Sequence, residues 1–569
     1  MRARLFGLTC LLFFAACSAD CSGPNASSRA VPSPVATRGA EPAEVATAEE
    51  PSRPAPACPG SAEPRGTVYY VCDCARGAAP GCRTGSDSND GRRPDKPFQS
   101  YQRAREQFSH LAPGETIAFC RGGSFSIEPN SEQQWVDAAC RADRPCVVRD
   151  YHPTWGQATD ALPILRAPAE GRVFSLDDSG DAEHEEGYLF ANLDLEGSGS
   201  GWAIFLYNDI DDVTMCNLTI NDFTIGVHLG GSNTAGPGSD GKNERITLRG
   251  SRLTNNKGHG WLGSSTGTVI EDNHFDNNGF EKAIYNHNIY LSGEDDRNVR
   301  VSRNELTRSA IVDGKCQGTS LVVHGRFVNL KIEDNLIRED MGAADPTCWG
   351  IGVVTGYKTP EAFRNVVIAR NTIVNVGNVS IALNACRGCV VENNVIVNEQ
   401  NENDSAISIP AMDRDNGDLS DDAISVRYNS IFIDRGTGIT LDKEGSGHSV
   451  VGNAIRSLGR KSTACFSLDL PQQAYQRVDY NVCDPGSDGH WTSTGLRLSQ
   501  WSKGTGFDSH SALADPMFAA TAAPHYDLTP NPGSPLLGHG DPADKPAMDR
   551  SGKRRAKPLP DVGAIEPSR

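Results

Sequence analysis

A short motif recurs through the middle of the chain and constrains the fold more than any other feature. Each copy has an apolar residue, two variable residues, an asparagine, one variable residue and a second apolar residue. The copies lie at 246–253, 268–275, 299–306, 330–337, 366–373, 389–396, 424–431 and 448–455. The asparagines are Asn273, Asn304, Asn335, Asn371, Asn394, Asn429 and Asn453, with Ser251 in this position in the first copy. A repeat at intervals of 20–50 residues indicates a solenoid.

The spacing of the copies indicates the kind of solenoid. The shortest intervals are 22 residues from Ser251 to Asn273 and 23 residues from Asn371 to Asn394. Three short strands with their turns need about this length to close one coil, and longer intervals add a loop. Because parallel crossovers are almost always right-handed, we expect an all-β, right-handed parallel β-helix with its core at 205–460.

The asparagine column itself has a structural explanation. A side-chain amide at a sharp inward turn can donate and accept hydrogen bonds at once, so identical amides stack along the axis. We therefore expect these asparagines to stabilise the turns and not to take part in catalysis.

A second strand recurs in every coil and presents one column of side chains outward. We align the copies of this strand on the leucine, isoleucine or valine that faces inward. The outward column is then His228, Trp261, Tyr290, Val322, Val353, Ala382, Ser408 and Thr440. Since the added loops enter beside this column, we expect the working face between about 228 and 326.

The N-terminus has the pattern of an export signal. Arg2 and Arg4 precede an apolar run at 5–16 that is too short to span a bilayer, and Cys17 follows. This pattern predicts a lipoprotein signal at 1–16 with lipid on Cys17, and an ordinary cleaved signal peptide is the alternative. Residues 17–66 are rich in Pro, Ala, Ser and Glu, which predicts a tether. We expect an exported protein, lipid-anchored at the outer membrane or cell surface.

The charge restricts the partners. The formal net charge is −18, from 72 acidic and 54 basic residues. Nucleic acid is therefore excluded as a partner, and a polyanionic substrate needs a local basic group or a cation. We expect a monomer.

The chain has 17 cysteines, which suits an oxidising compartment. Local disulfides are the favoured interpretation, because the solitary Cys386–Cys389 motif lacks two further ligands for zinc. Cys316 and Cys348 lie in the added loops of neighbouring coils, so we predict a disulfide between them.

The coils, with phrases such as HNIYLSG (287–293), resemble the pectate-lyase-like superfamily. The segments at 85–91, 94–104 and 111–125 resemble its opening region, and those at 515–518, 525–528, 532–540 and 561–566 resemble its closing region. The resemblance implies an amphipathic capping helix at 97–110, a first region at 67–204 and a closing region at 461–569.

The resemblance also implies a candidate chemistry, because many members of this superfamily are polysaccharide lyases. A lyase needs a base and a positive charge beside the uronate carboxylate. The candidate catalytic residues are Lys315, Arg326, His324 and His287, and the candidate substrate-binding residues are Trp261, Tyr290, His228, His259 and Lys282. Lys315 and Arg326 resemble a lysine–arginine pair of alginate and chondroitin-type lyases, although His324 occupies the earlier position here.

Two alternatives concern acidic residues. The Gly258-His259-Gly260 turn, with Asp209, Asp211 and Asp212 upstream, resembles inverting polygalacturonase-type hydrolases in part, but the other hydrolase motifs are missing. Residues 294–296 could supply oxygen ligands to Ca²⁺, although a solvated turn is the favoured interpretation. No cofactor is otherwise expected.

Two classes of function remain open. One is a polysaccharide lyase acting on an acidic glycan, and the other is a non-catalytic surface protein that binds glycans or partners.

Overall fold

The computed structural model describes Cys58 and residues 66–129, 134–157, 160–178, 185–231, 241–415, 417–459 and 463–567. The described residues all belong to the compact unit at residues 48–569. The predicted signal, the lipidation site at Cys17 and most of the predicted tether therefore lie outside the described residues. Within the described part, no helix is long and apolar enough to cross a membrane.

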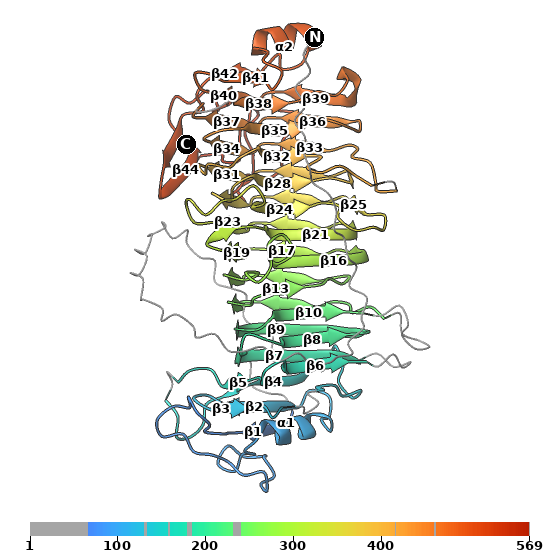
Figure 1. The fold of residues 1–569 in the computed structure, drawn as a ribbon, viewed down its shortest axis with the longest axis vertical. Helices are drawn as coiled ribbons and strands as arrows, with labels where there is room; N and C mark the ends of the chain where they lie inside the picture. Colours follow the sequence, from blue (N-terminus) through green and yellow to red (C-terminus); the bar gives the residue numbers. More distant parts are fainter. Residues whose placement is uncertain are drawn as a thin grey trace, which may run out of the picture. The chain divides into compact units, whose positions relative to one another are not determined.

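The described unit is a right-handed parallel β-helix, as predicted, built from two long parallel sheets (Figure 1). The second sheet has 14 strands. Its main path is β6 (Arg172–Asp177), β8 (Trp202–Tyr207), β10 (Ile225–Gly230), β13 (His259–Leu262), β16 (His287–Arg297), β21 (Thr319–Val328), β24 (Trp349–Val353), β28 (Val379–Leu383), β32 (Ser405–Ile409), β35 (Thr437–Leu441), β38 (Ala464–Ser467) and β41 (His490–Thr492), with β25 (Ala362–Arg364) and β29 (Cys386–Arg387) beside it.

The first sheet has 26 strands, and most coils contribute two short ones separated by the asparagine turn. It begins with β1 (Val68–Val71), β2 (Thr116–Cys120), β3 (Ser124–Ser126), β4 (Cys146–Tyr151), β5 (Ile164–Arg166), β7 (Glu185–Glu196) and β9 (Ile210–Asn221). The strands before the turn are β11 (Thr247–Arg249), β14 (Val269–Glu271), β17 (Arg300–Ser302), β22 (Lys331–Glu333), β26 (Val367–Ala369), β30 (Val390–Glu392), β33 (Ser425–Arg427), β36 (His448–Val451) and β39 (Tyr475–Asp479). Those after it are β12 (Arg252–Thr254), β15 (His274–Asp276), β18 (Glu305–Thr307), β23 (Leu336–Arg338), β27 (Thr372–Val374), β31 (Val395–Asn398), β34 (Ser430–Ile433), β37 (Ala454–Ser457), β40 (Val482–Asp484) and β42 (Ala512–Leu513).

The asparagine column forms the predicted ladder. The Asn273 side chain donates to Asn304 Oδ1 at 3.0 Å, and the same bond repeats from coil to coil up to Asn453. The ladder continues one coil further than predicted, because Asn453 donates to Asn481, which donates to Asp508. The residue before each ladder position has a positive φ, for example 57° at Arg370, and this conformation turns the chain sharply inward.

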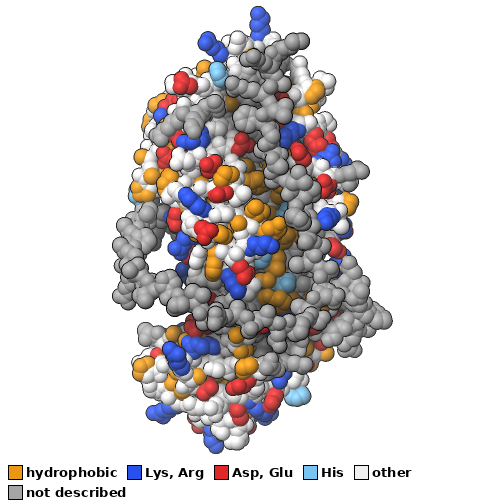
Figure 2. Space-filling view, viewed as in Figure 1, with side chains coloured by type: hydrophobic (Ala, Val, Ile, Leu, Met, Phe, Trp, Pro, Cys, Tyr) orange, Lys and Arg blue, Asp and Glu red, His pale blue; other side chains and the backbone are white. Residues whose placement is uncertain are grey.

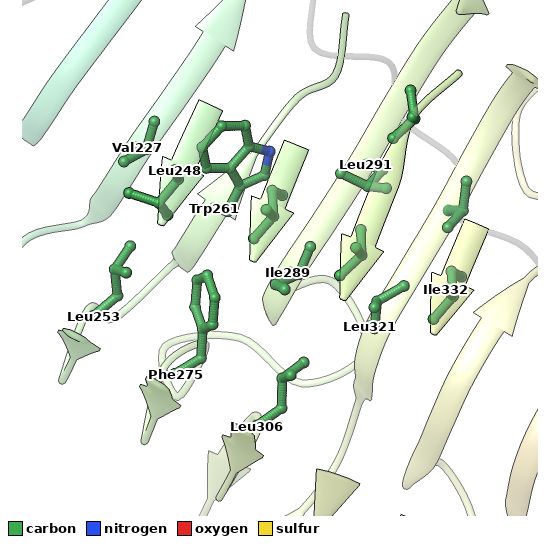
Figure 3. Close-up of a cluster of buried hydrophobic side chains, with 14 of the residues drawn as sticks. Val227, Leu248, Leu253, Trp261, Phe275, Ile289, Leu291, Leu306, Leu321 and Ile332 are labelled. Carbon is green, nitrogen blue, oxygen red and sulfur yellow. The ribbon is translucent and has the colours of Figure 1, made fainter. Parts of the chain in front are cut away.

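The core fills the space between the sheets, and Figure 3 shows part of it. Trp261 is fully buried there, so its prediction as an outward sugar platform is wrong. It is in register with Val227 and Ile289 of the inward column, and Leu262 takes the outward position. The indole N–H donates to Gly263 O at 2.8 Å, which satisfies the one polar atom of the ring inside the core. Val353 is likewise inward, with Gly352 in the outward position.

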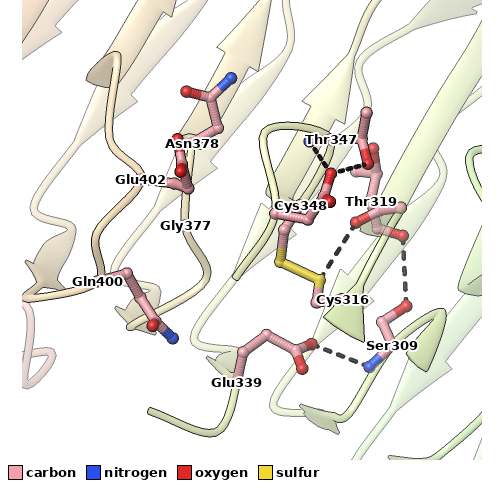
Figure 4. The surroundings of a disulfide bond; sticks show 12 residues. Ser309, Cys316, Thr319, Glu339, Thr347, Cys348, Gly377, Asn378, Gln400 and Glu402 are labelled. Atoms are coloured by element: carbon pink, nitrogen blue, oxygen red, sulfur yellow. Dashed lines mark hydrogen bonds between the residues drawn. A yellow bond between two sulfur atoms is a disulfide. The ribbon is translucent and has the colours of Figure 1, made fainter. Parts of the chain in front are cut away.

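Seven disulfides lie within the described part of the chain, and the predicted Cys316–Cys348 bond is one of them (Figure 4). It ties β20 (Lys315–Cys316), which forms a hairpin with β19 (Ile311–Val312), to the loop before β24. Cys386 and Cys389 also form a disulfide, which removes them as zinc ligands. A bond that was not predicted joins Cys58 to Cys216 in β9.

The two ends of the described unit differ. Helix α1 (Tyr101–Phe108) lies within the predicted helix range, and buries Tyr101, Ala104 and Phe108 beside β1 and β2. At the other end, helix α2 (Leu498–Thr505) lies near β41 (Figure 1). A short 3₁₀ helix, η1 (Gln472–Ala474), precedes β39, and β43 (Phe518–Ala522) and β44 (His525–Pro530) form an antiparallel hairpin.

Candidate functional site

Five ring side chains form a continuous row, which we call the ring row, on the outer face of the second sheet. It consists of His259, His287, Tyr290, His324 and Tyr357. Neighbouring ring centroids are 5.2–5.7 Å apart along the row. Figure 2 shows hydrophobic and histidine side chains gathered along the middle of the face in view.

Strand register explains why these residues meet. His259 of β13 is paired with His287 of β16, so the two imidazoles lie on adjacent coils. Tyr290 faces outward because Ile289 and Leu291 on either side of it are buried in the core. His324 of β21 is paired with Ser292, two residues beyond Tyr290, which brings the His324 ring to 5.6 Å from the Tyr290 ring.

A buried carboxylate holds one end of the row. Glu361 is fully buried, and its Oε1 lies 3.6 Å from His324 Nδ1. It also accepts backbone N–H groups from Gly325, Gly356 and Tyr357. Burial raises the pKa of Glu361, but the nearby His324 imidazole and the hydrogen bonds from these three amides outweigh it and hold the pKa below its ordinary value. The site therefore contains an ionised carboxylate behind a partly exposed imidazole.

Two phenols flank the same imidazole. The hydroxyls of Tyr290 and Tyr357 are 2.8 Å apart, and the His324 ring lies 5.2 Å from the ring of Tyr357. Burial raises the pKa of both phenols, so both remain protonated at neutral pH. One hydroxyl donates to the other, so together with His324 the pair provides a base and one free proton donor within one cluster.

The remaining histidines of the working face are neutral. Burial lowers the pKa of His259 to about 3 and of His228 to about 4, and it lowers the pKa of His287 well below its ordinary value. His287 Nδ1 lies 2.8 Å from Thr319 O, which fixes its ring. These imidazoles can bind hydroxyl groups but carry no charge for a carboxylate.

The structure does not bring Lys315 and Arg326 together. Lys315 is exposed on the β19–β20 hairpin, where its Nζ donates to Gly342 O at 2.6 Å. Arg326 lies near the far end of β21, seven residues after Thr319, a step of roughly 23 Å along a strand. Arg326 makes a bidentate contact with Asp295 at 2.9 Å. Lys315 and Arg326 therefore engage different partners, and their joint role in catalysis stays a prediction.

Lys282 and His228 make their ring contacts with residues outside the ring row. Lys282 is exposed, and its Nζ lies 4.1 Å from the centre of the Tyr285 ring. His228, on β10, packs against Trp202 and Phe205 with ring centroids 5.0 and 5.1 Å away. It belongs to the same outer face but to an earlier part of it.

The acidic alternatives gain no geometric support. Asp211 and Asp212 lie in β9 of the first sheet and form ion pairs with Arg245, whereas His259 lies in the second sheet. In the 294–296 turn, Asp295 is paired with Arg326, and burial raises the pKa of Asp296 to about 6. Among the described residues, no group of three or more His, Cys, Asp or Glu side chains is placed to hold a metal ion.

Sequence reasoning found three histidines and one tyrosine of the ring row but missed Tyr357 and Glu361. Both lie in the loop after β24, one coil beyond His324. The Glu361 backbone N–H donates to Asp418 Oδ1, so a loop from a later coil fixes its position. The run GYKTPE (356–361) contains no recognisable motif. Tyr357 and Glu361 join the site only because they lie next to His324 of the preceding coil.

Comparison with known proteins supports the fold. No family model matches the chain, and no curated protein matches it. Among solved structures, the PL6 family alginate lyase AlyGC has a TM-score of 0.51 and 11% identity, covering 82% of this chain and 59% of that chain. The Dettilon tailspike protein has a TM-score of 0.47 and 13% identity, covering 72% and 70%. A GH136 lacto-N-biosidase from Eubacterium ramulus has a TM-score of 0.43 and 13% identity, covering 66% and 67%. At these identities the likeness concerns the fold alone, and by fold the chain is similar to the parallel β-helix proteins.

Proposed function

We propose that the protein is a polysaccharide lyase that cleaves an acidic glycan by β-elimination at the ring row. The observation that carries the proposal is the placement of His324 between Tyr290 and Tyr357, with the buried carboxylate of Glu361 behind it. An imidazole that is oriented by a carboxylate is a common general base.

Each group has a defined part in this reaction. Glu361, whose Oε1 lies 3.6 Å from His324 Nδ1, favours a proton on Nδ1, and this leaves the Nε2 lone pair to take the proton from the carbon beside the uronate carboxyl. The electrons of that C–H bond form the new double bond as the bond to the glycosidic oxygen breaks. A tyrosine hydroxyl, from Tyr290 or Tyr357, donates a proton to the departing oxygen. When the substrate binds, the second phenol exchanges its hydrogen bond with the first for one to the carboxylate, where negative charge develops.

The test is incubation with a panel of uronate polysaccharides, followed by ultraviolet absorbance of the unsaturated ends. We expect His324→Asn to lower the rate by about 10²–10⁴-fold, as for loss of a general base, and Glu361→Gln to lower it less. A matched control is His274→Asn, because His274 also faces a glutamate, Glu305 at 3.3 Å, but lies in the first sheet. The His274→Asn variant should release unsaturated ends at the same rate as the unchanged protein.

Lys315→Ala separates this proposal from the lysine–arginine mechanism. Elimination at the ring row leaves Lys315 without a role, so the rate should not change. Loss of activity in Lys315→Ala with retention in His324→Asn would reject the proposed base.

The alternative function is glycan binding without catalysis. It is favoured by the absence of lysine or arginine from the ring row and by the engagement of Arg326 with Asp295. Saturable binding of a uronate polysaccharide with no unsaturated product would support this alternative.

We also propose that the protein is exported and lipid-anchored through Cys17. The disulfides of the described unit support an oxidising compartment. Metabolic labelling with a radioactive fatty acid tests the anchor, because Cys17→Ser should abolish incorporation. Equal labelling of the variant would show that the anchor is elsewhere.

A further inference from the structure

The backbone of Glu361 is held by a loop from two coils further along the solenoid. Glu361 lies in the loop after β24, whereas Asp418 and Leu419 lie in the loop after β32, two strands further along the second sheet. The Glu361 N–H donates to Asp418 Oδ1 at 2.8 Å, and the Leu419 N–H donates to Glu361 O at 3.0 Å. Both backbone polar groups of Glu361 are therefore bonded to neighbouring residues of one loop.

Asp418 is itself held from a further coil. Its second carboxylate oxygen, Oδ2, accepts the Asp415 N–H at 2.9 Å. Arg414 Nη1 donates to Asp418 O at 3.0 Å, and Arg414 Nε lies 2.5 and 2.7 Å from the two carboxylate oxygens of Glu444. Glu444 belongs to the loop after β35, one coil beyond Asp418. We call Arg414, Asp418 and Glu444 the loop brace.

The loop brace reaches the proposed base through the Glu361 side chain. The Glu361 carboxylate lies 3.6 Å from His324 Nδ1 and accepts the backbone N–H groups of Gly325, Gly356 and Tyr357. A shift of the Glu361 backbone would move this carboxylate relative to the imidazole. Because a misplacement of about 1 Å can lower a rate about 10²-fold, the position of the backbone matters for catalysis.

The inner part of the loop brace is stronger than the outer part. The Arg414 and Glu444 side chains are 29% and 23% exposed, so water and salt weaken their attraction. Asp418 is only 7% exposed, and loss of its carboxylate would leave the buried N–H of Glu361 without a partner. The brace therefore depends mainly on Asp418.

We propose that Asp418 is a positioning residue, which keeps the Glu361 carboxylate behind His324. Arg414 and Glu444 support Asp418 from the next coil. The inference rests on the proposed function, and Asp418 acts through Glu361 without touching the substrate. It extends the part of the solenoid that the reaction needs from the predicted range of 228–326 to the loop at 442–447.

The first test reads the tautomer of His324 by nuclear magnetic resonance in protein with labelled histidine. The signal that disappears in His324→Asn identifies the residue. We expect the Nδ1–H form to predominate in the unchanged protein near pH 7, and Asp418→Ala to remove this predominance, because the carboxylate no longer faces Nδ1. Asp418→Asn should restore part of it, because its side-chain oxygen can still accept the Glu361 N–H.

The second test is the rate of elimination. Asp418→Ala should lower kcat about 10–100-fold with little change in KM, because Asp418 does not touch the substrate. Arg414→Gln should lower kcat less than Asp418→Ala does. If Asp418 acts through Glu361, adding Asp418→Ala to Glu361→Gln should cost less than Asp418→Ala costs alone.

Asp413→Ala is the matched control, since Asp413 lies in the same loop but its side chain is 98% exposed. It should keep both the tautomer and the rate. Arg414→Gln, at a partly exposed position, allows the same comparison where Asp418→Ala does not fold.

A His324 tautomer in Asp418→Ala that equals the tautomer in Asp413→Ala would overturn the proposal, whatever the rate. A tautomer that changes only in Asp418→Ala, in a protein without lyase activity, would uphold the positioning of Glu361 and reject elimination.

Discussion

The ladder asparagines show how single residues specify this fold. Asn371 Oδ1 accepts both the backbone N–H and the side-chain amide of Asn335, while its own amide donates to Ile332 O and Asn394 Oδ1. One side chain thus satisfies polar groups on the two coils that flank its own. Because all of these groups are buried, no solvent can replace the bonds.

We predict that Asn371→Ala destabilises the protein by roughly 3 kcal/mol or more, because it leaves several buried polar groups without partners. Chemical denaturation would measure the change. Asn401→Ala is the control, since Asn401 is exposed, and it should change the free energy of unfolding by less than about 0.5 kcal/mol. Equal effects of the two substitutions would contradict a structural ladder.

At the level of strands, sequence periodicity predicted the inward turns but not the register of the second sheet. The ladder position recurs with fixed apolar neighbours, so its alignment is unambiguous. In the second sheet the pairing passes from His259 directly to Trp261, which breaks simple alternation at Gly260. Simple alternation therefore predicts the wrong face for Trp261, which is fully buried.

Sequence periodicity likewise predicts only part of the candidate site. Tyr290 and three histidines could be found because they lie on or beside a repeated strand. Glu361 could not, because its position depends on contacts between a loop and neighbouring coils and not on periodicity. Side chains on loops between coils are placed by packing that one sequence does not reveal.

The outer face of the second sheet should make stability depend on pH. The pKa of His228 is lowered to about 4 and that of His259 to about 3, against an ordinary value of 6.5. Below pH 6.5 the unfolded chain therefore binds protons that the folded protein excludes. We predict that the free energy of unfolding falls as the pH drops from about 6.5 to 4, by up to about 1.4 kcal/mol per pH unit for each fully buried imidazole.

Denaturation at a series of pH values would measure this dependence. His259→Gln should flatten the curve between pH 6.5 and 4, whereas His525→Gln, at an exposed position, should leave it unchanged. A curve for His259→Gln that parallels the unchanged protein would show that His259 accepts a proton in the folded state.

At the scale of the described unit, the closing segment does not cap the end of the solenoid. It folds back along the first sheet, where Phe518, Leu528 and Val562 pack in one apolar cluster with Val397 of β31 and Phe432 of β34. The last coils are closed differently, because Trp491 and Trp501 both donate to Asp508, where the asparagine ladder ends. The closing segment therefore stabilises the side of several coils at once.

Arg555 anchors this segment and provides the test of its role. Its side chain is fully buried, donates to Asn393 Oδ1 at 2.9 Å and to Gly563 O at 2.6 Å, and lies 4.7 Å from the centre of the Tyr428 ring. We predict that Arg555→Met costs roughly 3 kcal/mol, because it leaves Asn393 and Glu566 with unpaired buried oxygens. Limited proteolysis should then cut within 515–566 before the coils are attacked. The exposed neighbour Arg554 provides the control, and an identical digestion pattern for Arg554→Met and Arg555→Met would show that the coils hold the segment without this anchor.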